Sequence, residues 1–166
     1  MAQAEQYFTE DLHPIDIVEH IAEHHEWDFD RVADDQIAMA VEGQWRTYSI
    51  TLAWSPNDET LRLICTFDMD PPKDRLPVLY EALNQANDMC WAGAFSYWLE
   101  QKLMVWRYGL ILSGGQMAQA EQIDTMIRAA VLSCERFYPA FQLVTWGQES
   151  AESAMSVAIA EAYGRA

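Results

Sequence analysis

Residues 79–95 read LYEALNQANDMCWAGAF, and this stretch decides how the chain folds. Its apolar residues, with one just before it, recur at spacings of three and four: Leu76, Leu79, Leu83, Ala86 and Cys90. This spacing predicts a helix with one apolar face. The polar residue Asn87 lies near the centre of that face. A buried amide without a hydrogen-bond partner costs about 1–3 kcal/mol, so Asn87 is expected to lie beside a group that it can bond.

The residues after this helix are expected to supply that group. A connection through Trp91, Ala92 and Gly93 enters the next predicted strand. We expect Asn87 to hydrogen-bond the backbone of this connection or of a neighbouring strand, and Asn84, one helical turn earlier, to assist. We interpret the asparagines as a structural lock between helix and sheet. The alternative is that Asn87 holds a ligand.

Before this helix, alternating apolar and polar residues predict three strands. The strands are expected at residues 36–42, 45–54 and 61–69. A turn at 55–58 joins the last two, and the short connections favour an antiparallel meander. Farther upstream, Pro14 lies in the first turn of a predicted helix whose apolar pattern fades by Trp27.

After Gly93 the pattern predicts two further strands and two further helices. The strands are expected at 94–100 and 102–112, and the helices at 117–138 and 150–164. Pro139 is expected to interrupt the first of these helices, with a short helical turn following it through Trp146. The 102–112 strand is apolar on both faces, which predicts that both sides of the sheet are covered there.

The order of these elements, α-β-β-β-α-β-β-α-α, predicts a single α+β domain over residues 1–166. Its centre is a five-stranded antiparallel sheet flanked by helices. Residues 1–11 are expected to form a flexible segment. The sequence shows no linker, repeat or low-complexity segment that would divide the chain.

The chain carries a formal net charge of -16, from 26 acidic and 10 basic residues. This charge repels DNA, RNA and anionic lipid, so neither nucleic acid nor a membrane is an expected partner. No apolar run of about 18 residues predicts a membrane span, and the first residues lack a signal-peptide pattern. The widely spaced Cys65, Cys90 and Cys134 are typical of free thiols in apolar surroundings. These features together favour the cytoplasm.

Several motifs are weak candidates for chemistry. His20 and His24 belong to a sequence with the spacing of an inverted zinc-peptidase motif, but no later segment offers a third ligand. We interpret them as part of a polar helix face, with adventitious metal binding as the alternative. Asp68 and Asp70 are interpreted as the polar end of a strand rather than an acid pair. The loop at 113–116 lacks the lysine of a phosphate-binding loop. We therefore predict no catalytic residue, no metal and no cofactor.

Arg107 is the most unusual basic residue, because it lies in the middle of a strand between Trp106 and Tyr108. The favoured interpretation is that it pairs with a carboxylate and stacks on the aromatic rings. The alternative is that it anchors an anionic ligand.

Parts of the second half resemble the YbjN family of small bacterial proteins, which are labelled sensory transduction regulators. The matching segments are LNQAN (83–87), GAF (93–95), VWRY (105–108) with Leu110, and RFYPAFQLVTWG (136–147). The closing AMSVAIAEAYGRA resembles the end of the family's alphaproteobacterial members. These motifs are structural rather than catalytic. The family is similar in fold to the dimeric chaperones of type III secretion, which implies a small acidic α+β protein that binds extended segments of partner proteins.

The residues and the resemblance together lead us to expect a non-enzymatic regulatory or protein-interaction protein, chaperone-like and homodimeric, with an unidentified protein partner. The dimer interface is expected to use strands of the second half, with Trp98 and Trp106 as anchors. The alternative is a small-molecule sensor or cryptic enzyme with a pocket near Arg107. A closed pocket with convergent polar groups would favour that alternative, and a flat apolar groove would favour protein binding.

Overall fold

The protein is described here from a computed structural model that places residues 12–164, with side chains as far as residue 160. The flexible segment predicted at residues 1–11 lies outside the described residues. The helices are α2 (Pro14–His24), α3 (Leu76–Asp88), α4 (Ala120–Trp146) and α5 (Ala151–Gly164), with a short 3-10 helix η1 (Lys73–Arg75). The strands are β1 (Asp28–Ala33), β2 (Gln36–Glu42), β3 (Thr47–Ser55), β4 (Thr60–Asp68), β5 (Ala94–Trp98) and β6 (Leu103–Ile111).

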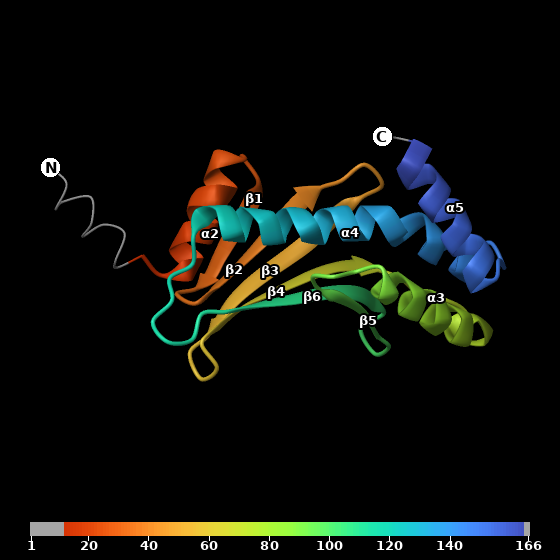
Figure 1. Ribbon diagram of the computed structural model, residues 1–166, viewed down its shortest axis with the longest axis horizontal. Coiled ribbons are helices and arrows are strands. Elements are labelled where there is room, and N and C mark those ends of the chain that lie inside the picture. The colour runs from red at the N-terminus through yellow and green to blue at the C-terminus, as the bar shows by residue number, and fades with distance from the viewer. Residues whose placement is uncertain (1–11, 165–166) are drawn as a thin grey trace, which may run out of the picture.

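All neighbouring strands are antiparallel, and the order across the sheet is β1-β2-β3-β4-β6-β5. The first four strands form a meander, as expected for the three that the sequence predicted. Helix α3 leaves the end of β4 and returns the chain to β5 at the sheet edge, and β6 then fills the place between them (Figure 1). The fold is therefore α+β, as predicted, but with six strands rather than five.

The missed strand is β1, because its sequence DFDRVA lacks the apolar alternation that identifies a half-buried strand. Its inward positions are Phe29 and Arg31. The Arg31 guanidinium reaches helix α2 and pairs with Asp16 and Glu19, each at 3.0 Å. Ion pairs with α2 therefore replace apolar burial at this edge of the sheet.

Helix α4 is longer than predicted, because it continues through Pro139 to Trp146. A proline inside a helix removes one backbone hydrogen bond and usually kinks or ends the helix. Here the residues on both sides of it are buried in the core, among them Phe137, Phe141 and Val144. Tertiary packing on both sides of Pro139 thus compensates for the lost backbone bond.

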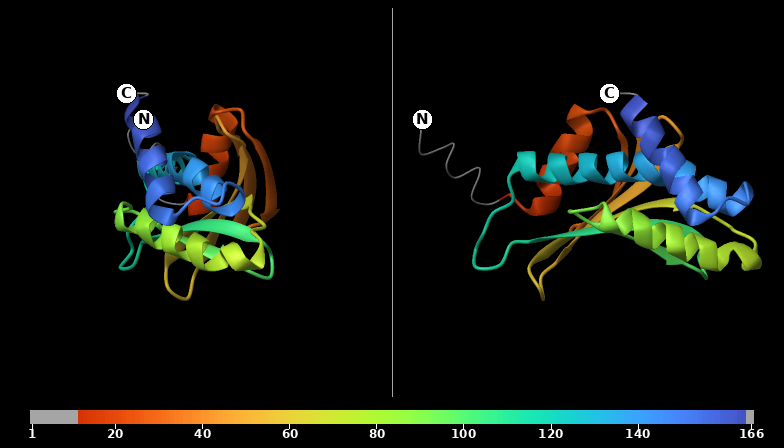
Figure 2. Two further views of the ribbon diagram at one scale, coloured as in Figure 1. Left: turned by 90° about the vertical axis from the view of Figure 1, so that its right-hand side faces the viewer. Right: turned by 45° about the vertical axis from the view of Figure 1, so that its right-hand side comes forward.

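The helices gather on one side of the sheet, and the hydrophobic core lies between them and the strands (Figure 2). We call this side the inner face and the opposite side the outer face. Strand β6 shows the difference, because Trp106 on the inner face is completely buried while Arg107 and Ile111 on the outer face are exposed. The prediction that both sides of this strand are covered is wrong for the described residues. Val105 on the outer face is nevertheless buried.

Candidate functional site

Asn87 joins helix α3 to strand β5. Its side-chain Nδ2 donates a hydrogen bond to the Phe95 carbonyl at 3.1 Å, and the Phe95 N–H donates to Oδ1 of Asn87 at 2.6 Å. The N–H and C=O of one strand residue point to the same edge, so the amide occupies the free edge of β5 as another strand would. This protects an edge that could otherwise pair with a foreign chain. The expected bond from Asn87 to neighbouring backbone is confirmed, whereas Asn84 is exposed and lies off the buried face.

Gly93 brings the connection after α3 against the indole of Trp106. Its φ is +75°, and a Cβ atom placed on it would lie 2.1 Å from Cζ2 of Trp106. No other residue fits this position without displacing the ring. Asn87, Gly93 and Trp106, which the sequence singled out separately, therefore form one junction between α3, β5 and β6.

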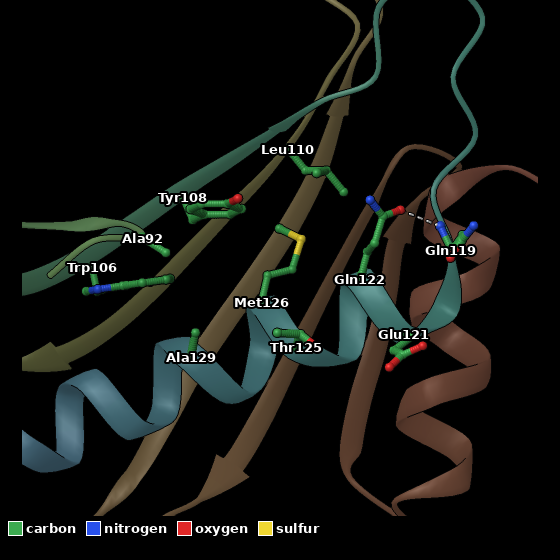
Figure 3. A pocket seen from close by; sticks show the side chains of 10 residues that line it. All are labelled: Ala92, Trp106, Tyr108, Leu110, Gln119, Glu121, Gln122, Thr125, Met126 and Ala129. Atoms are coloured by element: carbon green, nitrogen blue, oxygen red, sulfur yellow. Dashed lines mark hydrogen bonds between the residues drawn. The ribbon is translucent and has the colours of Figure 1, made fainter.

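A cavity of about 320 Å³ adjoins this junction, between the inner face of β6 and the first half of α4 (Figure 3). Its lining residues come from three segments: Ala92, Trp106, Tyr108, Leu110, Gln119, Glu121, Gln122, Thr125, Met126 and Ala129. Met126 and Ala129 rise from α4 toward the strand, while Glu121 points away from it. The walls near Trp106 are therefore apolar, and polar groups collect at the start of α4.

One of these polar groups is already engaged. The Gln119 N–H donates to Oε1 of Gln122 at 2.9 Å, and the Gln119 side chain accepts from the first turn in return, which caps the helix. Trp106 and Tyr108 stack at 6.2 Å between ring centroids. The cavity therefore offers aromatic and aliphatic surface near Trp106, and the side chains of Tyr108, Glu121 and Thr125 add hydrogen-bonding groups that the helix cap does not use.

A second cavity of about 220 Å³ continues along α4 and shares Ala92 and Ala129 with the first. It is lined by the α3–β5 connection and the next turns of α4: Met89, Cys90, Trp91, Ala92, Ala129, Leu132, Ser133, Arg136 and Phe137. We call the two cavities together the α4 groove. Trp91 is fully exposed at its lip, and Leu132 is 62% exposed. The groove is thus open to solvent and carries two large apolar side chains at its mouth.

Cys90 is the one cysteine among the residues that line the α4 groove. Burial raises the pKa of its thiol, and the opposing effect of Arg136 is smaller. The protonated thiol that results at neutral pH is a poor nucleophile. The pKa of Cys134 is raised well above its usual value by a hydrogen bond with Cys65, whose sulfur lies 3.6 Å away, and by burial. The arrangement is suited to packing rather than to thiol chemistry.

The histidines near the start of the chain do not line the α4 groove. His20, His24 and His25 line a cavity of about 860 Å³ between α2 and the start of α4. Nε2 of His25 lies 2.9 Å from Asp124, and its ring stacks on Trp27 at 4.4 Å. Within residues 12–160, no group of three or more His, Cys, Asp or Glu side chains is arranged to hold a metal ion.

Two predicted site residues, Trp106 and Arg107, are placed differently from expectation. Trp106 is completely buried in the core, so it does not lie on an exposed strand surface that a second copy of the chain could meet. Arg107 is exposed on the outer face, whereas the cavity lined by its neighbours Trp106 and Tyr108 opens on the inner face. The favoured carboxylate pairing of Arg107 is also absent from the described residues. Trp98 is half-buried on the outer face, beside Leu103.

The residues at the groove mouth, Trp91 and Leu132, were missed as site residues. Trp91 was read only as part of a connection, and Leu132 lies off the apolar stripe of α4. The role of Glu135 was also missed. Its carboxylate accepts a hydrogen bond from the Tyr48 hydroxyl at 2.5 Å. It also accepts bonds from two backbone N–H groups of the β2–β3 turn, at 2.9 and 3.2 Å. A large apolar residue at a polar helix position was the only available sequence signal for Leu132.

Comparison with known proteins supports the family resemblance. The crystal structure of YbjN from E. coli, described as a putative transcription regulator, superposes with a TM-score of 0.54 and 11% identity, over 73% of this chain and 85% of that chain. At this identity the likeness shows the fold alone. No curated protein matches the chain in sequence. No helix within residues 12–164 combines the length and hydrophobicity that a membrane span requires.

The family model covers most of the described fold. It is the model for YbjN, a putative bacterial sensory transduction regulator, and it matches residues 14–143. This range runs from the start of α2 to within the last turn of α4, and so includes the junction at Asn87 and the whole α4 groove. The chain therefore belongs to the YbjN family.

Proposed function

We propose that this protein is a non-enzymatic regulator that binds an apolar segment of a partner protein in the α4 groove. The observation that carries the proposal is the position of Trp91, fully exposed beside an open apolar groove. Exposed apolar patches of this kind mark interaction sites, and tryptophan is enriched among the residues that dominate binding energy. A family of putative regulators is consistent with such a role.

The groove supports protein binding better than small-molecule sensing or catalysis. Its two cavities measure about 320 and 220 Å³, at or below the small end of the usual range for ligand pockets. The polar side chains of the groove are spread along α4, from Gln122 to Arg136, rather than converging on one centre, and burial keeps the Cys90 thiol protonated. An open apolar trough along a helix is a surface into which a peptide can fit its side chains.

The partner segment is expected to be apolar with basic residues around it. The net charge of -16 attracts basic polypeptides and accelerates their encounter with the groove. In this sense the role is chaperone-like, as the resemblance to type III secretion chaperones implies. We place the protein in the cytoplasm, because its three cysteines are free thiols, which are typical of a reducing compartment.

Affinity capture from a lysate of the source organism tests the proposal, with wild type, Trp91→Ala and Leu132→Ala compared by quantitative mass spectrometry. Ile111→Ala is the matched control, because Ile111 is 68% exposed but lies on the outer face. We expect proteins that the wild type and the control retain and that both groove variants lose. Equal retention by all four proteins would refute the groove as the binding site.

A further inference from the structure

The two cavities of the α4 groove follow one another along the axis of α4. The α4 residues that line the first cavity lie between positions 121 and 129, and those that line the second lie between 129 and 137. The midpoints of these stretches, Thr125 and Ser133, are eight residues apart. Because an α-helix rises 1.5 Å per residue, the two cavities are centred about 12 Å apart along α4. The groove can therefore take two side chains that are separated by this distance.

Small side chains mark the passage between the cavities. Ala92 of the α3–β5 connection and Ala129 of α4 are the two residues that line both cavities. Figure 3 shows them on opposite walls of the groove. Their methyl groups leave room there, so the backbone of a bound segment can come close to the groove between its two large side chains.

The backbone of a bound segment also needs hydrogen-bond partners once water is excluded. An extended segment finds them at a free strand edge. The sheet edge beside β6 is β5, and the amide of Asn87 occupies that edge at Phe95. An extended segment would find the edge blocked there, whereas a helix bonds its own backbone and presents side chains alone. The groove therefore favours a helical occupant.

We propose that the occupant of the α4 groove is an amphipathic helix of a partner protein, lying along α4. This inference rests on the proposed function and names the kind of segment bound. Apolar side chains at positions i and i+7 or i+8 of a helix lie on one face about 10.5–12 Å apart, which matches the two cavities. A small residue near i+4 lies over Ala92 and Ala129. This occupant differs from the extended segments that the chaperone resemblance implies.

The charges of the groove lie at its two ends and specify the ends of the bound helix. Glu121 borders the first cavity and Arg136 the second, about 22 Å apart along α4. The Arg136 guanidinium lies 5.0 Å from the centroid of the Phe137 ring. Within residues 12–160 neither Glu121 nor Arg136 forms an ion pair. A helix with a basic residue at the first end and an acidic residue at the second complements both charges.

Selection from a displayed library of random 18-residue peptides tests this pattern on the immobilised full-length protein. Trp91→Ala serves as the counter-target, because Trp91 is fully exposed and its loss should leave the fold intact. Peptides retained by wild type and not by Trp91→Ala should carry apolar residues at i and i+7 or i+8, with a small residue between them. Synthetic copies should gain helical circular dichroism on binding. A proline at the central small position should weaken their binding about tenfold or more.

Charge reversal in the protein tests the ends of the pattern. Selection on Arg136→Glu should replace the acidic residue at the second end of the peptides with a basic one. Arg128→Glu is the matched control, because it makes the same charge change on α4 but lies outside the groove and pairs with Asp124. It should select the same peptides as wild type. Unchanged peptides from Arg136→Glu would overturn the assignment of this end.

The remaining outcomes separate the helix from the groove. Peptides that depend on Trp91 but alternate apolar and polar residues, or that tolerate the central proline, would show an extended occupant. They would overturn the helix while leaving the groove as the binding site. Selected peptides that bind wild type and Trp91→Ala equally, or a selection that enriches no peptide, would overturn the proposed function and the helix with it.

Discussion

Asn87 and Trp91 lie four residues apart, and they show two opposite uses of the same connection. The amide of Asn87 bonds both backbone groups of Phe95 and closes the edge of β5. Trp91 is fully exposed at the groove mouth. The first position is a polar residue held inside, and the second is an apolar residue held outside. Each reverses the usual preference. The bonds of Asn87 show that it serves the fold, and we propose that Trp91 serves binding.

Helix α4 repeats this contrast within one turn. Glu135 bonds the Tyr48 hydroxyl and the backbone of the β2–β3 turn, while Leu132 is exposed beside Trp91 in the lining of the groove. The comparison therefore separates a supporting set, Asn87, Gly93 and Glu135, from a binding set, Trp91 and Leu132. Substitutions in the first set should lower stability, and those in the second should leave it unchanged.

Gly93→Ala should have the largest effect in the supporting set. Its methyl group would overlap the Trp106 ring and would also strain the backbone at a φ of +75°. We expect a loss of about 3 kcal/mol or more in the free energy of unfolding, measured by urea denaturation. Gly114→Ala is the matched control, since Gly114 has the same φ of +75° but nothing within 4 Å. Equal losses in both variants would show that the contact with Trp106 contributes nothing.

Asn87→Leu should cost about 1–3 kcal/mol, because it leaves the N–H and C=O of Phe95 without partners. The exposed Asn84 offers a control on the same helix, and Asn84→Leu should change stability by less than about 0.5 kcal/mol. Hydrogen exchange sharpens the comparison, since the Phe95 amide should be protected in wild type and lose protection in Asn87→Leu. An unchanged or raised denaturation midpoint for Asn87→Leu would contradict the structural lock.

Glu135→Ala should cost about 1–2 kcal/mol, somewhat less than Asn87→Leu, because the turn that Glu135 holds is exposed to water on one side. Glu135→Gln keeps an acceptor oxygen and should recover part of the loss. Thermal unfolding of the three proteins measures both effects. A Glu135→Ala variant as stable as wild type would show that the β2–β3 turn does not depend on α4.

The raised pKa of Tyr48 predicts how the free energy of unfolding changes at alkaline pH. Its pKa is raised by burial first, and then by the hydrogen bond to Glu135 and the negative charge of that residue. The native state therefore keeps the phenol proton that the unfolded chain loses near pH 10. Stability should be unaffected by this group below that pH and should fall as pH rises above it. Tyr48→Phe should flatten the fall, and a slope identical to wild type would contradict this assignment.

The sequence predicts the supporting set better than the binding set. Asn87 was identified because a polar residue interrupted an apolar stripe, and its bonded partner lies only eight residues away. Local periodicity also gave β2, β3, β4 and the position of α3. Burial of Trp106 was not predicted, because an alternating strand does not say which of its two apolar faces meets the helices.

Other errors came from tertiary contacts that local patterns do not contain. Strand β1 was not predicted, because Arg31 takes the place of an apolar residue on its inner face. Arg31 forms ion pairs there with Asp16 and Glu19 of α2. Helix α4 passes Pro139 because distant core residues hold both halves. Exposure of Trp91 depends on how the α3–β5 connection meets α4, so no pattern along the chain could predict it.

Trp91→Ala tests the central claim most directly, because it should alter binding without altering the fold. The measurement is the Kd of wild type and variant for the captured partner segment by titration calorimetry, with urea denaturation of both proteins beside it. The account predicts binding weaker by about tenfold or more and a denaturation midpoint unchanged within about 0.5 kcal/mol. An unchanged Kd, or a loss of stability as large as that of Asn87→Leu, would contradict it.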